Sequence, residues 1–162
     1  MNIFYLDSDP EKCARYHCDS HVAKMIVEST QMLSTAWHVV GNPPCEIYKL
    51  THLNHPSTKW VRESKNNFIW LWQMAMWLCD EFQYRRDKHH ATEIMLSKMK
   101  FPPLPNLEFT EPPKAMPDEF KIIGVCSSYR NYYANGKQHL HRWTRRGEPD
   151  WLEFFKDEVI ES

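Results

Sequence analysis

The stretch Lys65–Arg86 reads KNNFIWLWQMAMWLCDEFQYRR and predicts the central helix of the protein. Between residues 68 and 79 nearly every side chain is apolar, so a helix here would be hydrophobic on almost all sides, which is typical of a buried helix. This run of about twelve residues contains Gln73 and is well short of the roughly 20 residues that span a bilayer. We therefore expect a helix inside a globular core, capped by Ser64.

A second long helix is predicted over Asp19–Val40, where apolar residues recur mostly at steps of three and four. Shorter helices are expected to begin at Asp9-Pro10 and at His55-Pro56, because a capping residue followed by proline is typical of a first helical turn. Further expected elements are a short strand at residues 2–6, a helix at residues 122–133 and a last short helix at residues 149–155.

These elements predict a mainly all-α fold, a compact helical bundle around one buried helix, in a single domain over residues 1–162. A chain of 162 residues can bury one substantial core, and its aromatic content of 14% is unlike that of disordered proteins. Residues 101–117 carry six of the eleven prolines, which excludes a regular helix there. We expect this segment to cross the domain as an extended loop.

The cysteines and the N-terminus indicate a cytoplasmic protein. The five cysteines are odd in number and form no CxxC pair, so a disulfide framework is not expected. The sequence MNIFYLDSDPEK has neither the basic start nor the long apolar core of a secretory signal. We expect no membrane association.

Positive charge is concentrated in one segment. The net charge of −1 argues against a broadly basic surface, yet residues 121–146 contain six Lys or Arg and no acid. Because cations bind phosphates and aromatic rings stack on bases, residues 129–146 predict a nucleic-acid or nucleotide surface. Its expected contacts are Arg130, Lys137, Arg142, Arg145 and Arg146, with Trp143 as a stacking ring. The alternative places Tyr132, Tyr133 and Trp143 in the core beside solvated cations.

A polar series shares one face of the helix over Asp19–Val40 and its approach: His17, His21, Lys24, Glu28, Gln31, Thr35 and His38. Lys24 and Glu28 lie one turn apart and can pair, and such a carboxylate could hold a proton while a neighbouring amine attacks. The alternative is an ordinary solvated face.

Histidines on this face also suggest a metal site. His17 and His21 share one helix side, and His55 could complete a zinc site. Without a CxxC or HExxH motif the spacing is not diagnostic, so we expect neither a metal nor a cofactor.

Three segments resemble, in order, the pyrimidine-dimer DNA glycosylase/endonuclease V family. They are HCDSHVAKMIVESTQML (17–33), NHPSTKWVRESKNNFIWLWQMAMWLCDEF (54–82) and YRNYYANGK (129–137). The chain also looks like small phage proteins that begin in a similar MNIF-like way.

The resemblance implies an all-helical enzyme that removes a damaged base through an amine, which forms an imine with the sugar, assisted by one helix glutamate. Glu28 matches that glutamate. In the family the amine is the chain's own N-terminus, freed when Met is removed from a small second residue. Here Asn2 is bulky, so Met1 is expected to be retained, and three alternatives follow: the Met1 amine serves, Lys24 serves, or the lyase chemistry is absent. An α-amine, with a pKa ordinarily near 8, is the better nucleophile at neutral pH.

The sequence thus predicts a DNA base-excision enzyme, either a glycosylase or a glycosylase/lyase, with Glu28, Lys24, Met1 and His21 as catalytic candidates. Two alternatives stay open. One is a non-catalytic protein that binds a nucleotide or small phosphate ligand, and the other is a metal-dependent hydrolase. The expected partner is DNA or a nucleotide ligand, and no oligomeric state is predicted.

Overall fold

The computed structural model describes the backbone of residues 1–160 and the side chains of residues 1–156. Within that range the chain forms seven α-helices and no strand, which confirms the all-α prediction. The helices are α1 (Pro10–Tyr16), α2 (Asp19–Val40), α3 (Pro56–Val61), α4 (Lys65–Arg86), α5 (Glu93–Lys98), α6 (Val125–Gly136) and α7 (Leu152–Ile160).

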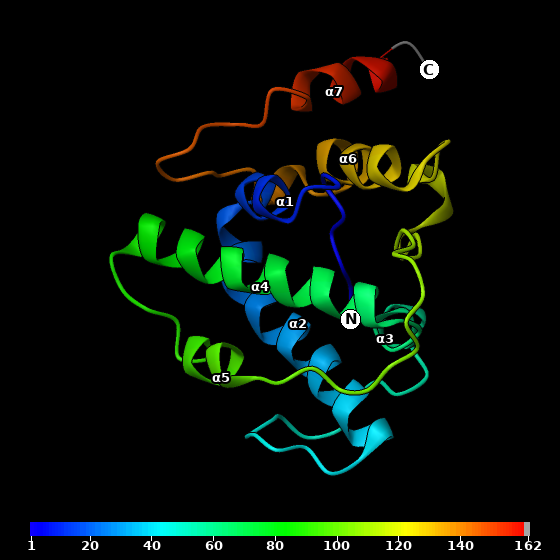
Figure 1. The fold of residues 1–162 in the computed structure, drawn as a ribbon. Helices are drawn as coiled ribbons and strands as arrows, with labels where there is room; N and C mark the ends of the chain where they lie inside the picture. The colour runs from blue at the N-terminus through cyan, green and yellow to red at the C-terminus, as the bar shows by residue number, and fades with distance from the viewer. Residues whose placement is uncertain (161–162) are drawn as a thin grey trace.

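The two long helices begin and end where the sequence predicted. α4 lies across α2, and α1 packs against the C-terminal half of α4 (Figure 1). The Ser64 side chain caps α4 by accepting a hydrogen bond from the Asn67 backbone N–H at 3.1 Å. Asp9 caps α1 in the same way, accepting from the Lys12 N–H. These caps satisfy backbone donors that would otherwise lack partners at a helix start.

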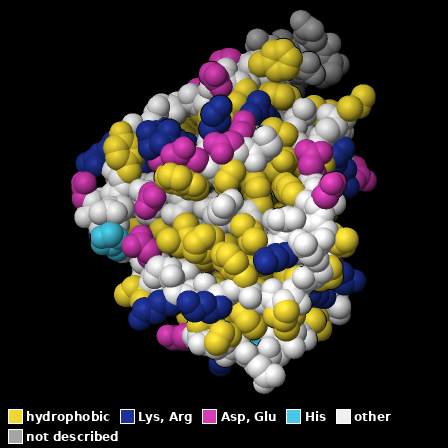
Figure 2. Space-filling view, viewed as in Figure 1, with side chains coloured by type: hydrophobic (Ala, Val, Ile, Leu, Met, Phe, Trp, Pro, Cys, Tyr) yellow, Lys and Arg dark blue, Asp and Glu magenta, His cyan; other side chains and the backbone are white. Residues whose placement is uncertain are grey.

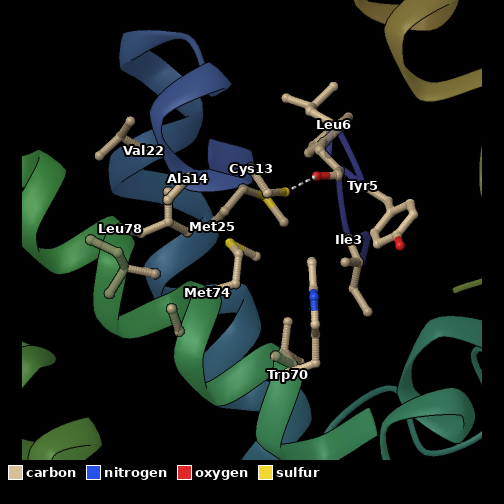
Figure 3. Packing of buried hydrophobic residues seen from close by; sticks show 14 of the residues in the cluster. Ile3, Tyr5, Leu6, Cys13, Ala14, Val22, Met25, Trp70, Met74 and Leu78 are labelled. Atoms are coloured by element: carbon tan, nitrogen blue, oxygen red, sulfur yellow. Dashed lines mark hydrogen bonds between the residues drawn. The ribbon is translucent and has the colours of Figure 1, made fainter. Parts of the chain in front are cut away.

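The core lies where α2, α4 and the N-terminal segment meet. Figure 3 shows Met25 of α2 and Met74 of α4 facing each other, with Ile3 and Leu6 of the N-terminal segment closing the cluster from the side. All four side chains are at most 1% exposed. The N-terminal segment is therefore part of the core, and its burial fixes the position of that segment in the fold.

The strand expected at residues 2–6 does not form. The segment has no partner strand within residues 1–160. The Phe4 carbonyl accepts from the Leu6 N–H and from the Cys13 thiol, and the Leu6 carbonyl accepts from the Arg130 guanidinium at 2.8 Å. A run of β-prone residues thus forms no ladder, because a ladder needs a second strand and the described residues supply none.

Residues 101–117 form no helix and run from the end of α5 past the start of α4 toward α6 (Figure 1). Hydrogen bonds tie the segment to the first turn of α4. The Pro105 and Leu107 carbonyls accept from the Lys65 N–H and from the Asn66 amide, at 2.8 and 2.7 Å. The proline-rich crossing, as we call residues 101–117, is therefore held in place.

The outer face of α4 carries exposed hydrophobic side chains. Figure 2 shows such side chains grouped on the face where α4 and α5 lie, and Trp77 and Ile94 are 38% and 65% exposed. α4 is central in the bundle without being enclosed all round. None of the helices in the described part of the chain is long and apolar enough to cross a membrane.

Candidate active site

Glu28 lies between two amines. Its Oε1 is 3.7 Å from the α-amine of Met1, and its Oε2 is 3.7 Å from Nζ of Lys24, one turn earlier on α2. The Glu28 side chain is 15% exposed, whereas Lys24 is 68% exposed and largely in solvent. The chain therefore places its own N-terminus against a partly shielded carboxylate, although α2 and the N-terminal segment meet only in the folded protein.

His21, two turns before Glu28, is buried in an aromatic setting. Its ring stacks on Phe4 with 4.3 Å between centroids, and its Nδ1 is 2.5 Å from the Tyr133 hydroxyl of α6. Burial lowers the pKa of His21 to about 3, and the positive charges of Lys137 and Lys24 add to this effect. Burial also raises the pKa of Tyr133 well above its usual range. Both groups are consequently neutral at physiological pH.

Positive side chains surround the outer edge of His21. Lys24 comes from α2, whereas Lys137 and His139 come from the end of α6 and the turn that follows it, and the charge of each lowers the pKa of His21. Lys137 also lies 5.1 Å from the centre of the Tyr132 ring. No motif in the sequence marks His139, which is exposed. These basic side chains lie around His21, and of the three only Lys24 pairs with Glu28.

The basic residues expected to contact phosphates fall into two sets. Arg130 and Arg146 form ion pairs with Asp7 at 3.1 Å and with the buried Glu81 at 2.5 Å. Arg145 pairs with Asp87 at 2.8 Å at the surface. Lys137 and Arg142 have no acidic partner among the side chains of residues 1–156. The positive segment is therefore partly neutralised by acids from other helices, which sequence position does not reveal.

Trp143 is not placed to stack on a base. The side chain is buried at 6% exposure, and its indole Nε1 donates to the Tyr16 carbonyl at 2.8 Å. That carbonyl belongs to the last turn of α1, where intrahelical donors run out. The expectation of a stacking ring is corrected here: Trp143 caps a helix and fills the core, as the alternative reading proposed.

The three histidines considered as metal ligands serve other purposes. His17 is fully buried, its Nδ1 is 2.7 Å from the Cys13 carbonyl, and burial lowers its pKa to about 4. His55 caps α3 by accepting from the Ser57 N–H at 3.0 Å. No group of three or more His, Cys, Asp or Glu able to hold a metal ion occurs among the described residues.

His55 does lie near the paired amine and carboxylate. Burial lowers its pKa, the positive charge of the Met1 amine and of His52 lowers it further, and the Glu28 carboxylate opposes these effects. Its place at the start of α3 therefore borders the candidate site, although the sequence suggested it only as a metal ligand.

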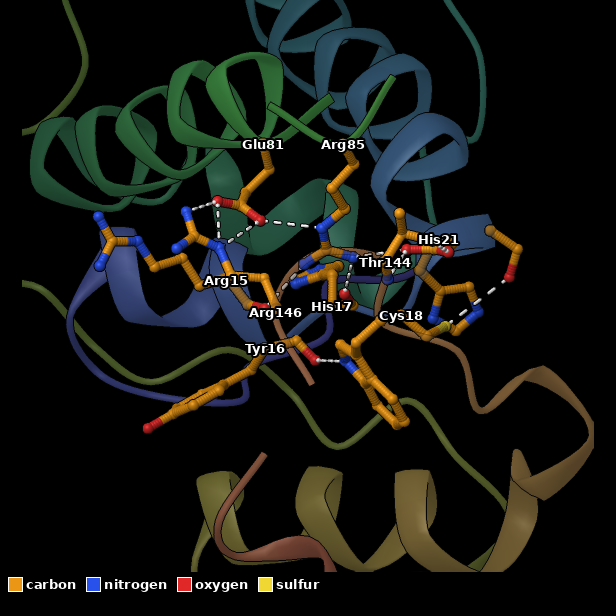
Figure 4. Close-up of polar contacts among 12 residues, drawn as sticks. Arg15, Tyr16, His17, Cys18, His21, Glu81, Arg85, Thr144 and Arg146 are labelled. Atoms are coloured by element: carbon orange, nitrogen blue, oxygen red, sulfur yellow. Dashed lines mark hydrogen bonds and ion pairs between the residues drawn. The ribbon is translucent and has the colours of Figure 1, made fainter. Parts of the chain in front are cut away.

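A buried ionic network centres on Arg85, and Figure 4 shows it together with His17 and His21. The Arg85 guanidinium donates to Glu81 at 2.9 Å, to Asp19 at 3.1 Å, and to the carbonyls of Arg15 and His17 at 2.9 and 2.8 Å. Asp19 also accepts from the Thr144 N–H at 2.9 Å. The network joins the end of α4 to the start of α2. No local pattern indicates that Arg85, which stands in an Arg-Arg pair at a helix end, is buried.

The fold and the site together define a class: an all-helical protein that brings its own α-amine against a helix glutamate. The family model for pyrimidine dimer DNA glycosylase matches residues 1–95, more than half of the chain, and the protein belongs to this family. Neither the curated proteins nor the solved structures yield a match. The matched residues contain Met1, His21, Lys24 and Glu28, whereas Tyr133 and Lys137 lie beyond them.

Proposed function

We propose that the protein excises bases from DNA and cleaves the resulting abasic site, acting through an amine and the Glu28 carboxylate. One observation carries this proposal: the two oxygens of Glu28 each lie 3.7 Å from an amine nitrogen, one of Met1 and one of Lys24. A nucleophile beside a group that can take its proton is the arrangement that covalent catalysis requires. Membership of the family supports pyrimidine dimers as the lesion.

The proposed reaction uses only these groups and the substrate. The neutral amine attacks C1′ of the target deoxyribose, and the N–C1′ bond forms as the glycosidic bond breaks. The departing base keeps the bonding electron pair and gains a proton. Opening of the sugar ring then yields an imine at C1′, and loss of a proton from C2′ expels the 3′ phosphate. Glu28 accepts a proton from the amine and stabilises the positive charge on the sugar and the imine.

Basic side chains without a buried acidic partner support DNA as the partner. Lys24 is 68% exposed beside Glu28, and Lys137 and Arg142 have no acidic partner among the side chains of residues 1–156. Contacts of such cations to phosphates supply most of the non-specific affinity for DNA. Arg145 can add to them, because its exposed ion pair with Asp87 is of a kind worth little in water. We expect Arg130 and Arg146 to contribute chiefly to the fold.

The test is borohydride trapping on a DNA duplex that carries an abasic site. Condensation of the amine with the C1′ aldehyde releases water, and borohydride reduces the imine to a stable secondary amine, whose position mass spectrometry maps. Cleavage of the strand at pyrimidine dimers in ultraviolet-irradiated DNA is measured in parallel, because the excised base stays joined to its neighbour in the dimer and is not released as a free base. Glu28→Gln should lower both rates by roughly 10²- to 10⁴-fold, the usual contribution of a proton-transfer group. Glu11→Gln, which loses an exposed ion pair with Arg15 on α1, is the matched control.

An adduct at Met1 or Lys24 that depends on Glu28 supports the proposal. Wild-type protein that forms no adduct and does not cleave irradiated DNA at dimers would refute it.

A second candidate is non-catalytic binding of a nucleotide or small phosphate ligand, which an open groove at the start of α2 favours. Ser20, Arg86, His139 and Arg142 are among the residues that line this groove of about 450 Å³. Calorimetry against a nucleotide panel tests this function. Tight binding of a nucleotide, with no trapping on abasic DNA, would favour it over excision.

A further inference from the structure

The side chain of Asn2 uses all of its hydrogen-bonding groups to fix the start of the chain. Its Nδ2 donates to the Ala115 carbonyl at 2.9 Å, and its Oδ1 accepts from the Ile3 N–H at 2.7 Å. The Tyr129 hydroxyl lies 3.0 Å from the same Oδ1. A side chain with three such contacts has few conformations left, so residue 2 is held in one place relative to the proline-rich crossing.

Tyr129 connects this anchor to the rest of the fold. It lies on α6, is fully buried, and its hydroxyl accepts from the Ala115 N–H at 3.0 Å. Its one hydrogen can be donated either to Asn2 Oδ1 or to the Pro113 carbonyl, which is 2.7 Å away. The proline-rich crossing is tied in turn to α4, where Asn67 Oδ1 accepts from the Thr110 N–H. Asn2 is therefore anchored to two elements that the fold itself holds in place.

The α-amine of Met1 is one residue from this anchor. The Met1 side chain is 2% exposed and packs against the core, which leaves the amine little freedom apart from its approach to Glu28. Lys24 also reaches Glu28, but at the end of a flexible side chain that is 68% exposed. Proximity accelerates a reaction only when the reacting group is held in a productive geometry, so the two amines are not equivalent.

We propose that Asn2 and Tyr129 are positioning residues, which hold the α-amine of a retained Met1 against Glu28, and that this amine forms the imine. The inference rests on the proposed function and goes beyond it. A bulky second residue favours retention of the initiator methionine. In this fold the Asn2 side chain also fixes the position of the Met1 α-amine. If Met1 were removed, the α-amine would be that of Asn2, roughly 3.5 Å from its former position in the direction of the C-terminus.

The experiment separates chemistry from binding in five variants. Asn2→Leu keeps a bulky second residue and loses the amide contacts, Asn2→Ser permits removal of Met1, and Tyr129→Phe removes one hydroxyl. Asn135→Leu and Tyr48→Phe are matched controls, because they lose amide hydrogen bonds to Asn131 and to the Phe155 carbonyl, and a hydroxyl hydrogen bond to Thr92, none of which involves the crossing or Asn2. For each we would measure the intact mass, the thermal midpoint, the Kd for abasic DNA and the trapping rate at saturating DNA.

We expect wild-type protein to retain Met1 and to form its adduct there. Asn2→Leu, Asn2→Ser and Tyr129→Phe should trap roughly 10- to 100-fold more slowly with Kd unchanged within about two-fold, since misplacement by about 1 Å can cost 10²-fold in rate. The controls should trap at the wild-type rate. A general loss of folding would instead lower the thermal midpoint and weaken DNA binding together.

The outcomes separate the two proposals. A wild-type adduct on Lys24, a wild-type mass without Met1, or full trapping by the Asn2 and Tyr129 variants would overturn the positioning role and leave excision intact. Wild-type protein that neither traps abasic DNA nor cleaves irradiated DNA at dimers would overturn the proposed function and this inference with it.

Discussion

Replacement of Arg85 by Met should destabilise the protein strongly. The guanidinium is buried at 6% exposure and donates to two carboxylates, those of Glu81 and Asp19, and to two carbonyls at the end of α1. Met has a similar length and fills the space, so the substitution removes the charge and the donors with little change in packing. What is lost is the ionic link between α1, α2 and α4.

The size of the loss in unfolding free energy depends on the carboxylates and carbonyls that lose the Arg85 donor. Removal of one partner from a buried ion pair costs about 3–5 kcal/mol, because the other charge stays buried. Unpaired carbonyls add to the cost, but Glu81 keeps Arg146 and Asp19 keeps Thr144, which limits it. We therefore expect a loss of about 3–5 kcal/mol, which for a chain of this size corresponds to a fall in Tm of roughly 10 °C.

Urea unfolding followed by tryptophan fluorescence measures this loss. Arg86→Met is the matched control, since Arg86 is exposed and its guanidinium lies 5.1 Å from the centre of the Phe82 ring, a contact worth about 1 kcal/mol or less. The double variant Glu81→Gln/Arg85→Met should cost less than the two single losses added together, because neighbouring charges couple. A loss below about 1 kcal/mol for Arg85→Met would refute the network's role in stability.

Three further predictions follow from the site. Lys137→Gln and Arg142→Gln should each weaken DNA binding on any sequence and reduce the slope of log Kd against log salt by about 1, as measured by fluorescence anisotropy. Trp143→Phe should cost about 1–3 kcal/mol in urea unfolding, because it leaves a helix-end carbonyl unpaired, and should leave the Kd for DNA unchanged; weaker DNA binding would restore the stacking role. The folded-state pKa of His17, about 4, lies below its unfolded value near 6.5, so the unfolded chain binds more protons in this window and stability falls as the pH falls from 6.5 to 4. Unfolding curves across this range should show a loss of roughly 3 kcal/mol from His17, and a profile that is equally steep in His17→Phe would contradict the assignment.

The long helices could be predicted from the sequence because their signals are local. The bounds of α2 and α4 follow from the three- and four-residue period and from the cap at Ser64, all within a few residues of each other. The prediction of a strand at residues 2–6 was wrong, because strand formation does not depend on local signals alone. A strand needs a partner elsewhere in the chain, and no local pattern reports whether one exists.

The site shows the same division. The one-turn spacing of Lys24 and Glu28 was visible in the sequence, and the structure does bring Lys24 within 3.7 Å of Glu28. The burial of His21 could not be predicted from the sequence, because Phe4 and Tyr133, which contact its ring, lie far from it along the chain in opposite directions. A histidine in a polar series therefore belongs to the interior, which only the tertiary fold determines.

The structure assigns the early and late parts of the chain different tasks in one site. The amine and the carboxylate lie 27 residues apart, within the part that matches the family, yet the groups that fix the amine come from residues 113–129. Tyr133, which holds His21, also lies beyond the match. A fragment that ended at residue 95 would hold both reactive groups and lack the contacts that orient them. Because an amine and a carboxylate without fixed geometry are only an exposed ion pair, the reactivity proposed here is a property of the closed fold, and it should be lost together with the anchoring of Asn2.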